Sequence, residues 1–401
     1  MMRSFYEFFA GGGMARIGLG PGWDCLWAND LDRAKCAAYR ANFGGDHLLE
    51  RDVSAVAPAE LPGRADLAWA SFPCQDLSLA GARRGMTLGG TTRSSVFWAF
   101  WYLIEQLARE GRAPRTLVIE NVVGLASSSR DFATLCTALA QAGYRFDAHV
   151  VDASHFLPQS RPRLFVVAWL GGEPPEALRE AEGAPPRPRA LARALDALGE
   201  AGPARRALRL DLPRSRNLQL TDIVEDRPDG VAWRKAAEVK RLMGMMTPPH
   251  LARIETAKAE AARSGRAQAG TLYRRTRPDK TRGGTVQRAE VRFDLAGCLR
   301  TPAGGSSRQT LVLVEPSGKV RMRLISAREA ARLMGLPEDY ALPKGYTDAY
   351  KLAGDGVAVP AARWIAAELV EPLLDAMDAA EAAGGGAGDG DGEALRSAAG
   401  A

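Results

Sequence analysis

A cysteine at the end of an apolar segment could do chemistry. Residues 66–70 have the length and apolar character of a buried strand, and Pro73 has no N–H with which to continue a strand ladder. Cys74 is therefore expected at the tip of a strand, where a polar loop rich in Gly and Arg begins. A thiol held there beside basic side chains would suit a nucleophile that meets a polyanion. Most cysteines are small buried hydrophobes, however, so the rest of the chain must decide between these interpretations.

A second stretch with binding-site residue types lies near the N-terminus. The strand-like residues 4–9 lead into Gly11-Gly12-Gly13 and then into a helix-like segment. Glycines let the backbone approach a ligand closely, and a helix N-terminus favours negative charge, which indicates a nucleotide-type pocket. The spacing is not GxGxxG, so the dinucleotide fingerprint is absent.

Two carboxylates follow at the ends of the next strand-like runs. Asp30 stands about twenty residues after the start of this stretch, where a carboxylate can bind ribose hydroxyls. Asp52, after a further short run, could bind the exocyclic amine of an adenine. A solvated turn is the better account of each carboxylate alone, but the glycine turn and both carboxylates in series favour a nucleotide-type pocket.

The elements that must position these residues alternate in type. Strands are predicted at residues 4–9, 25–28, 66–70, 116–119, 144–151 and 164–170, and helices at residues 32–42, 96–109 and 131–142. This alternation predicts a largely parallel sheet with helices on both faces. Residues 171–206 are rich in Pro, Ala, Glu and Arg, and a second domain is expected beyond them.

Composition narrows the class of protein. No apolar run is long enough to span a bilayer and the N-terminus lacks a signal-peptide layout, so a cytoplasmic protein is expected. The five cysteines are scattered, without a CxxC pair or a His cluster, so neither a metal site nor a disulfide framework is expected. Residues 374–401 carry a formal charge of −5, which leaves +11 for the rest. This charge balance favours a nucleic-acid partner. A GC-rich genome, which favours Arg over Lys, could raise the Arg content without such a partner.

Six short motifs follow one another along the chain. They are FFAGGG at 8–13, PCQ at 73–75, ENV at 120–122, QSRPR at 159–163, RLISAREAARL at 323–333 and GDGV at 354–357. In type and order they resemble the motifs of the DNA cytosine-5 methyltransferases. The last motif departs from the Gly-Asn-Ser/Ala-Val that is common in that family, so cofactor contacts there could be made by the backbone.

The resemblance implies a fold and a division of the chain. The expected fold is α/β, the Rossmann-like S-adenosylmethionine-dependent methyltransferase fold, with a mostly parallel sheet, helices on both faces and a smaller target-recognition domain. The catalytic domain would comprise residues 1–185 and 345–378. The small domain would comprise residues 205–344, with the hinge-side motif at 321–336. Residues 186–204 would be a linker and residues 379–401, rich in Gly, Ala and Asp, a disordered tail.

The resemblance also implies a mechanism. Cys74 would attack C6 of cytosine as a thiolate, and Glu120 would lie against N3 and the amino group. Arg163 would bind the O2 edge, and Arg161 would orient Glu120 or the base. C5 would then take a methyl group from S-adenosylmethionine or a substituted form of it. The target cytosine would first have to flip out of the duplex.

Further contacts are expected from the same resemblance. The expected cofactor-binding residues are Phe9, Ala10, Gly11, Gly13, Met14, Asp30, Leu31, Asp52, Val53, Pro73, Asp355 and Val357. The expected substrate-binding residues are Gln75, Ser78, Asn121, Val122, Gln159, Arg300 and Arg308. Residues 273–308 hold nine basic and three acidic residues, which suits contact with double-stranded DNA. Which arginines read bases stays open.

The favoured interpretation is a monomeric DNA cytosine-5 methyltransferase in a bacterial or phage restriction-modification setting, with or without a paired restriction endonuclease. A tRNA cytosine-5 methyltransferase is the first alternative, but the long basic insert at 170–320 argues against it. A catalytically inactive DNA-binding protein is the second, and intact Cys74, Glu120 and Arg163 argue against that. A nicotinamide oxidoreductase would explain the glycine turn but not the PCQ motif.

Overall fold

A seven-stranded sheet forms the centre of the larger part of the molecule. The computed structural model describes residues 2–73, 95–278, 283–300 and 308–384. The strand order is β3-β2-β1-β4-β5-β7-β6. Their bounds are β1 (Arg3–Phe8), β2 (Trp23–Asp30), β3 (Leu48–Glu50), β4 (Leu67–Ala70), β5 (Thr116–Val122), β6 (Tyr144–Asp152) and β7 (Pro162–Leu170). The first five strands are parallel, whereas β7 runs antiparallel to both β5 and β6. The mostly parallel sheet confirms the predicted fold class.

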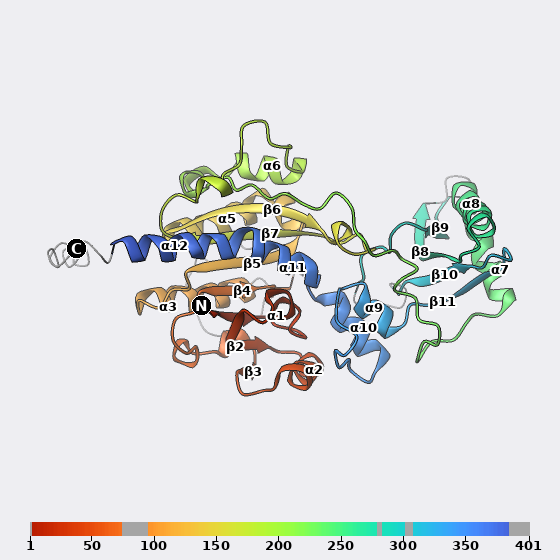
Figure 1. Ribbon diagram of the computed structural model, residues 1–401, viewed down its shortest axis with the longest axis horizontal. Helices are drawn as coiled ribbons and strands as arrows, with labels where there is room; N and C mark the ends of the chain where they lie inside the picture. The colour runs from red at the N-terminus through yellow and green to blue at the C-terminus, as the bar shows by residue number, and fades with distance from the viewer. Residues whose placement is uncertain (1, 74–94, 279–282, 301–307, 385–401) are drawn as a thin grey trace.

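Helices cover both faces of this sheet, because successive side chains of a buried strand point to opposite faces. In β1, Phe5 packs into one apolar cluster and Tyr6 into the other. The first cluster receives α1 (Met14–Leu19), α2 (Arg33–Phe43), α11 (Val359–Ile365) and α12 (Glu371–Gly384), with the π-helical turn Ala366–Val370 between the last two. The second receives α3 (Ser95–Arg109), α4 (Gly124–Ser127) and α5 (Ser129–Gln141). In Figure 1, α11 and α12 cross in front of the sheet.

A smaller antiparallel sheet lies beyond one end of the large one (Figure 1). Its order is β11-β10-β8-β9, with bounds β8 (Gln268–Pro278), β9 (Thr285–Arg292), β10 (Thr310–Val314) and β11 (Val320–Leu324). The helices α7 (Ala236–Gly244) and α8 (Pro248–Ser264) pack on this sheet. This small domain falls within the predicted range 205–344.

The joint between the two parts is built by the motif at 323–333. Arg323 and Glu329 are fully buried, and two guanidinium–carboxylate hydrogen bonds of 2.6 Å join them. The Ser326 hydroxyl accepts the N–H of Glu329 and so caps α9 (Ala327–Arg332). The next helix, α10 (Tyr346–Asp355), packs on α9 and leads back to the large sheet. The motif therefore fixes the direction of the chain between the two sheets.

The segment predicted as a linker, 186–204, is part of the large domain, so that prediction is wrong. It contains α6 (Arg189–Asp196) and the 3-10 turn Gly199–Ala204, which bury apolar side chains against α4 and α5. Arg187 and Arg205 both bind the fully buried Asp147 carboxylate, at 2.6 and 3.0 Å. A composition rich in Pro and Arg concealed a short amphipathic helix and a buried charge cluster.

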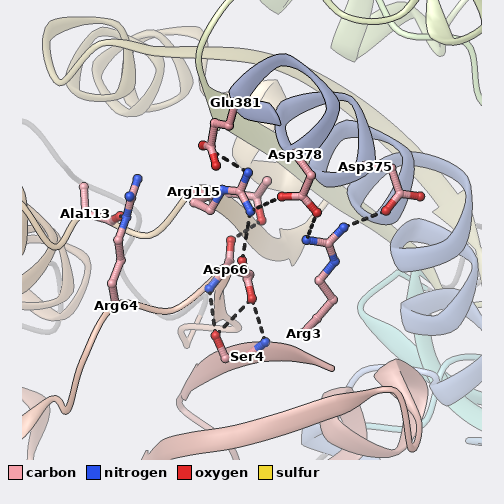
Figure 2. A network of polar contacts seen from close by, with 10 residues as sticks. Arg3, Ser4, Arg64, Asp66, Ala113, Arg115, Asp375, Asp378 and Glu381 are labelled. Carbon is pink, nitrogen blue, oxygen red and sulfur yellow. Dashed lines mark hydrogen bonds and ion pairs between the residues drawn. The ribbon is translucent and has the colours of Figure 1, made fainter. Parts of the chain in front are cut away.

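The predicted tail also begins too early, because α12 continues to Gly384. Glu381 pairs with Arg115 at 3.2 Å, and Asp378 accepts from both Arg115 and Arg3 at 2.6 and 2.7 Å. Figure 2 shows this network, in which Asp66 also contacts Arg115. These ion pairs hold the end of the helix against the amino ends of β1 and β5. The remainder of the predicted tail, 385–401, lies outside the described residues.

Further 3-10 turns of the large domain, among the residues that the structure describes, lie at Val53–Ala55, Pro58–Glu60, Ala153–His155 and Glu176–Leu178. Within the described ranges, no helix has the length and apolar character needed to cross a membrane.

Candidate active site

The carboxyl ends of the parallel strands open into one cavity of ≈1150 Å³. Most of the predicted site residues that the structure describes line it: Phe9, Ala10, Gly11, Met14, Asp30, Leu31, Asp52, Val53, Pro73, Glu120, Asn121, Val122, Arg161, Arg163, Arg300, Asp355 and Val357. Cys74, Gln75 and Ser78 lie outside the described residues. Pro73, the residue before Cys74 in the chain, lines the cavity. This cavity lies at the carboxyl ends of the strands, where open α/β sheets commonly bind their ligands.

The Asp30 carboxylate binds the backbone of the glycine turn. Phe9, Gly11 and Gly13 all have positive φ, between 56° and 74°. Residues with a side chain, such as Phe9, rarely adopt this conformation. The N–H of Gly11 donates to Oδ2 of Asp30 at 2.8 Å, and the N–H of Asp32 donates to Oδ1 at 2.8 Å. Burial raises the pKa of Asp30. The carboxylate therefore shapes the turn as well as lining the cavity.

Gly13 has a different role from the predicted one. It does not border the cavity, and a Cβ at this position would lie 2.4 Å from the ring of Phe43. Its small size lets α1 start close to α2. We therefore correct Gly13 from a cofactor contact to a packing position.

An apolar side chain and a carboxylate share the next part of the wall. Leu31 is 66% exposed although it is a large hydrophobe, and it borders the cavity. Asp52 is exposed, and its Oδ1 accepts from the N–H and the hydroxyl of Ser54, at 2.9 and 2.7 Å. Both Ser54 contacts use Oδ1 of Asp52, so they leave Oδ2 able to accept a hydrogen bond from a ligand. An exposed apolar face near carboxylates suits a planar heterocycle with polar substituents.

Glu7 is a cavity residue that sequence reasoning missed. It lies in β1 and is 1% exposed, and its Oε1 accepts the N–H of Arg16 at 3.3 Å. Its Oε2 has no hydrogen-bond partner among the residues that the structure describes. Burial raises the pKa of Glu7 to about 8. The available signal was an acidic residue inside an apolar strand that leads into a glycine turn.

Glu120 and Arg163 meet at the other side of the cavity. Glu120 lies near the end of β5 and Arg163 near the start of the antiparallel neighbour β7. Nε of Arg163 lies 3.3 Å from Oε1 of Glu120, and the two side chains are 15% and 8% exposed. The carbonyl oxygen of Pro162 accepts from Nη1 of Arg163 at 2.9 Å. The structure thus places a carboxyl group and a guanidinium together, both facing one cavity.

Arg161 lies deeper than its predicted role requires. Its Nη1 donates to the carbonyl oxygen of Leu299 at 3.1 Å, and its Nη2 donates to those of Gly354 and Gly356 at 2.9 and 2.7 Å. Burial and the nearby Arg163 lower its pKa to about 10, so it remains protonated at neutral pH. These bonds join three backbone segments, in place of the expected contact with Glu120 or the base.

Two predicted substrate-binding residues are committed to the protein itself. Gln159 is fully buried; its Nε2 donates to the carbonyl oxygen of Leu333 at 2.5 Å, and its Oε1 accepts the N–H of Leu299 at 3.0 Å. It cannot contact DNA, which corrects the prediction. Arg308 lies away from the cavity, where Nη2 donates to the Thr347 hydroxyl at 2.8 Å.

Asn121 borders the cavity but is also used for support. Its Nδ2 donates to the carbonyl oxygen of Phe72 at 3.1 Å, and its Oδ1 accepts the N–H of Val122 at 2.9 Å. Asn121 therefore holds residue 72, two positions before Cys74, against the end of β5.

Gly356 of the GDGV motif packs against Met14. A Cβ on Gly356 would lie 2.3 Å from Sδ of Met14, so a larger residue there would require the Met14 side chain to shift. The Asp355 carboxylate pairs with Nζ of Lys35 at 2.7 Å. Two backbone carbonyls of this motif, those of Gly354 and Gly356, bind Arg161, and a backbone contact with the cofactor stays a prediction.

Basic side chains of the small domain form the outer wall. Arg275, Arg292 and Arg300 border the cavity. Glu290 pairs with Arg275 at 3.3 Å and so offsets part of this charge. Within the described ranges, no group of three or more His, Cys, Asp or Glu could hold a metal ion.

Comparison with known proteins agrees with this geometry. The family model for C-5 cytosine-specific DNA methylase matches residues 3–371. The chain is 26% identical to the Type II methyltransferase M.NlaX of Neisseria lactamica over 94% of this chain and 99% of that protein. It is 24% identical to M1.ScrFI of Lactococcus lactis subsp. cremoris over 92% and 78%. In fold it is similar to the S. pombe Dnmt2 methyltransferase, with a TM-score of 0.55 and 17% identity over 92% and 99%. The chain therefore belongs to the C-5 cytosine-specific DNA methylase family.

Proposed function

We propose that this DNA cytosine-5 methyltransferase transfers a methyl group from S-adenosylmethionine to C5 of a flipped-out cytosine, within one specific sequence of double-stranded DNA. The observation that best supports the proposal is the Glu120–Arg163 pair at 3.3 Å, in the cavity that also contains the glycine turn. A carboxyl group and a guanidinium in this arrangement can bind the N3, amino and O2 edge of a cytosine.

The residues around the glycine turn fit the proposed cofactor. Asp30 would face the ribose hydroxyls, Leu31 would lie against the adenine ring, and Asp52 would accept its amino group. The buried Glu7, whose Oε2 has no hydrogen-bond partner within the described part of the chain, would place a titratable carboxyl group near this cationic ligand. S-adenosylmethionine, when bound, supplies an electrophilic methyl group on a sulfonium sulfur.

The proposed reaction begins with addition of the Cys74 thiolate to C6 of cytosine. The π electrons of the C5–C6 bond move toward C5 and the ring, while Glu120 gives a proton or a hydrogen bond to N3. Arg163 holds the O2 edge of the base. C5 then forms a bond to the methyl carbon, whose former bonding pair stays on the leaving sulfur. Loss of the C5 proton to a base would restore the double bond and expel the Cys74 thiolate, and a proton given to N3 would return to Glu120.

The small domain would supply target recognition. Groups that line a cavity cannot reach a cytosine inside a duplex, so the base must leave the stack at an expense of roughly a few kcal/mol. Arg275, Arg292 and Arg300, at the rim of the cavity, would contact phosphates or base edges of the DNA.

Bisulfite sequencing of host DNA after expression tests the proposal. The wild type and a Cys136→Ala control, altered at a buried thiol of α5, should protect cytosines in one sequence context, and Cys74→Ser should protect none. Unprotected DNA in all three samples would remove the proposed function. Mass spectrometry of the nucleosides would separate 5-methylcytosine from a larger substituent.

The covalent step needs its own test. A duplex with 5-fluorocytosine at the target should form an adduct that resists denaturation, with the bond at Cys74. An adduct at another residue, or no adduct with an active enzyme, would show that the nucleophile is wrongly assigned.

A further inference from the structure

One sulfur atom lies between the two arginines of the QSRPR motif. Cys298 belongs to a loop after β9 and borders the cavity. Its Sγ accepts from Nη1 of Arg161 at 3.3 Å and from Nη2 of Arg163 at 3.8 Å. Its own S–H is placed to donate to the carbonyl oxygen of Leu299 at 3.5 Å. The thiol can therefore act as a donor and as an acceptor at once.

The backbone that carries this sulfur is held from two sides. The N–H of Ala296 donates to the carbonyl oxygen of Pro158 at 2.8 Å, and the N–H of Ser160 donates to that of Ala296 at 2.9 Å. On the small-domain side, the Tyr273 hydroxyl donates to the carbonyl oxygen of Cys298 at 2.8 Å. A Cβ on Gly297 would lie 2.4 Å from the ring of Tyr273. The loop is thus packed between the two domains, and Cys298 has little freedom to move.

Each nitrogen of the Arg163 guanidinium has a contact. Nε meets Glu120, Nη1 meets the carbonyl oxygen of Pro162, and Nη2 meets Sγ of Cys298. The first two contacts come from β5 and from the backbone next to Arg163 itself. Within the described residues, Cys298 supplies the contact that comes from the small-domain side.

We infer that Cys298 is a positioning residue, whose sulfur fixes the plane of the Arg163 guanidinium beside Glu120 and thereby links the small domain to the base-binding groups. The inference rests on the proposed function, in which Arg163 holds the cytosine edge. A guanidinium with free rotation would present its donors in several orientations, whereas a fixed one is ready for the base.

Substitutions of Cys298 test this role through the rate of a single methylation turnover on saturating DNA. Cys298→Ala removes the acceptor and should lower the rate constant about tenfold, the scale expected for a hydrogen bond to a charged group. Cys298→Ser keeps a donor and an acceptor and should stay within about threefold of the wild type. Cys136→Ala is the matched thiol control and should leave the rate unchanged.

A double-mutant cycle with Arg163→Lys separates positioning from general packing. If Cys298 acts through Arg163, Cys298→Ala should add no further loss in the Arg163→Lys background. Equal losses for Cys298→Ala and Cys298→Ser, or an additive loss with Arg163→Lys, would overturn the inference. So would an unchanged rate in Cys298→Ala.

A second readout does not depend on activity. The Nε–H signal of Arg163 in NMR spectra, identified by its loss in Arg163→Lys, should exchange with solvent severalfold faster in Cys298→Ala than in the wild type or in Cys298→Ser. Equal exchange in all three would overturn the contact. A wild type without methyltransferase activity would instead remove the proposed function, while this measurement would still report on Cys298.

Discussion

The two halves of the cavity are built in different ways. Around the glycine turn, several side chains bind backbone groups within about twenty residues: Asp30 binds Gly11 and Asp32, and Asp52 binds Ser54. Two long-range contacts are added to these, from the Tyr340 hydroxyl to the carbonyl oxygen of Gly12 and between Lys35 and Asp355, both at 2.7 Å. Around Glu120 and Arg163, the contacts join distant segments. Arg161 reaches Leu299, Gly354 and Gly356, and Gln159 reaches Leu299 and Leu333.

The two halves of the cavity therefore have different requirements, one for backbone conformation and the other for the alignment of groups from two domains. The glycine-turn half needs a backbone of defined conformation, and the hydrogen bonds of Asp30 and Asp52 that set it lie within residues 11–54. The half around Glu120 and Arg163, the arginine half, needs groups of two domains to stay aligned. Buried hydrogen bonds between distant segments, such as those of Arg161 and Gln159, maintain this alignment. Substitutions in the glycine-turn half should therefore act on cofactor affinity, and those in the arginine half on turnover or on folding.

The largest effect is expected at Glu120. Glu120→Gln keeps the size and a hydrogen-bonding edge but removes the acid, so the turnover rate should fall by roughly 10²–10⁴-fold. Cofactor affinity, measured by calorimetry, should change less than about threefold, because the glycine turn is untouched. A comparable loss in cofactor affinity would show that the two halves are not separate.

Arg161 should show the next largest effect, on stability. Arg161→Met leaves the carbonyls of Leu299, Gly354 and Gly356 without their donor, and the free energy of unfolding should fall by about 3 kcal/mol. Arg163→Met, at a side chain that faces the cavity, should lose activity with a smaller fall in the free energy of unfolding, because its guanidinium binds one backbone carbonyl where that of Arg161 binds three. Urea unfolding of both variants measures the contrast, and equal destabilisation would contradict the division of roles.

The same contrast explains what the sequence could predict. The strand-to-glycine turn, Asp30 and the Glu120 strand end are local patterns, and residue types and spacing were sufficient to find them. Cys298 has no local pattern, because its role depends on neighbours far along the chain, whereas Glu7 had one signal, an acidic residue inside an apolar strand. Gln159 and Arg161 were found by resemblance, but their main contacts, with residues 299, 333 and 354, depend on how the two domains pack. The 186–204 segment was misassigned because composition does not show that Arg187 and Arg205 neutralise a buried aspartate.

Glu7 allows a test of the glycine-turn half through pH. Its pKa is about 8 in the folded protein, against 4.5 for an ordinary Glu, so between these values the folded state keeps a proton that the unfolded state has lost. The free energy of unfolding should therefore fall as pH rises toward 8. Glu7→Gln cannot titrate and should gain on the order of 2 kcal/mol over the wild type between pH 6.5 and pH 8.

The choice of pH window isolates Glu7 from the histidines. Burial lowers the pKa of His149 to about 4 and also lowers that of His47, so both contribute below pH 6.5. Urea unfolding of the cofactor-free protein at three pH values would measure the slope. Parallel curves for the wild type and Glu7→Gln would show that Glu7 is already ionised at pH 6.5.

The smallest effect is expected at the contact between Met14 and Gly356, where the glycine-turn half of the cavity meets the end of the GDGV motif. Gly356→Ala would place a Cβ 2.3 Å from Sδ of Met14, and overpacking of this kind weakens a structure by roughly 1–3 kcal/mol. Because both residues border the cavity, cofactor affinity should fall about tenfold in calorimetry. Met14→Ala alone should weaken binding less, and combined with Gly356→Ala it should restore most of the lost affinity, since the two changes exchange volume across one contact. A double variant as weak as Gly356→Ala would mean that Gly356 is required by its backbone, through the carbonyl that binds Arg161, and not by the size of Met14.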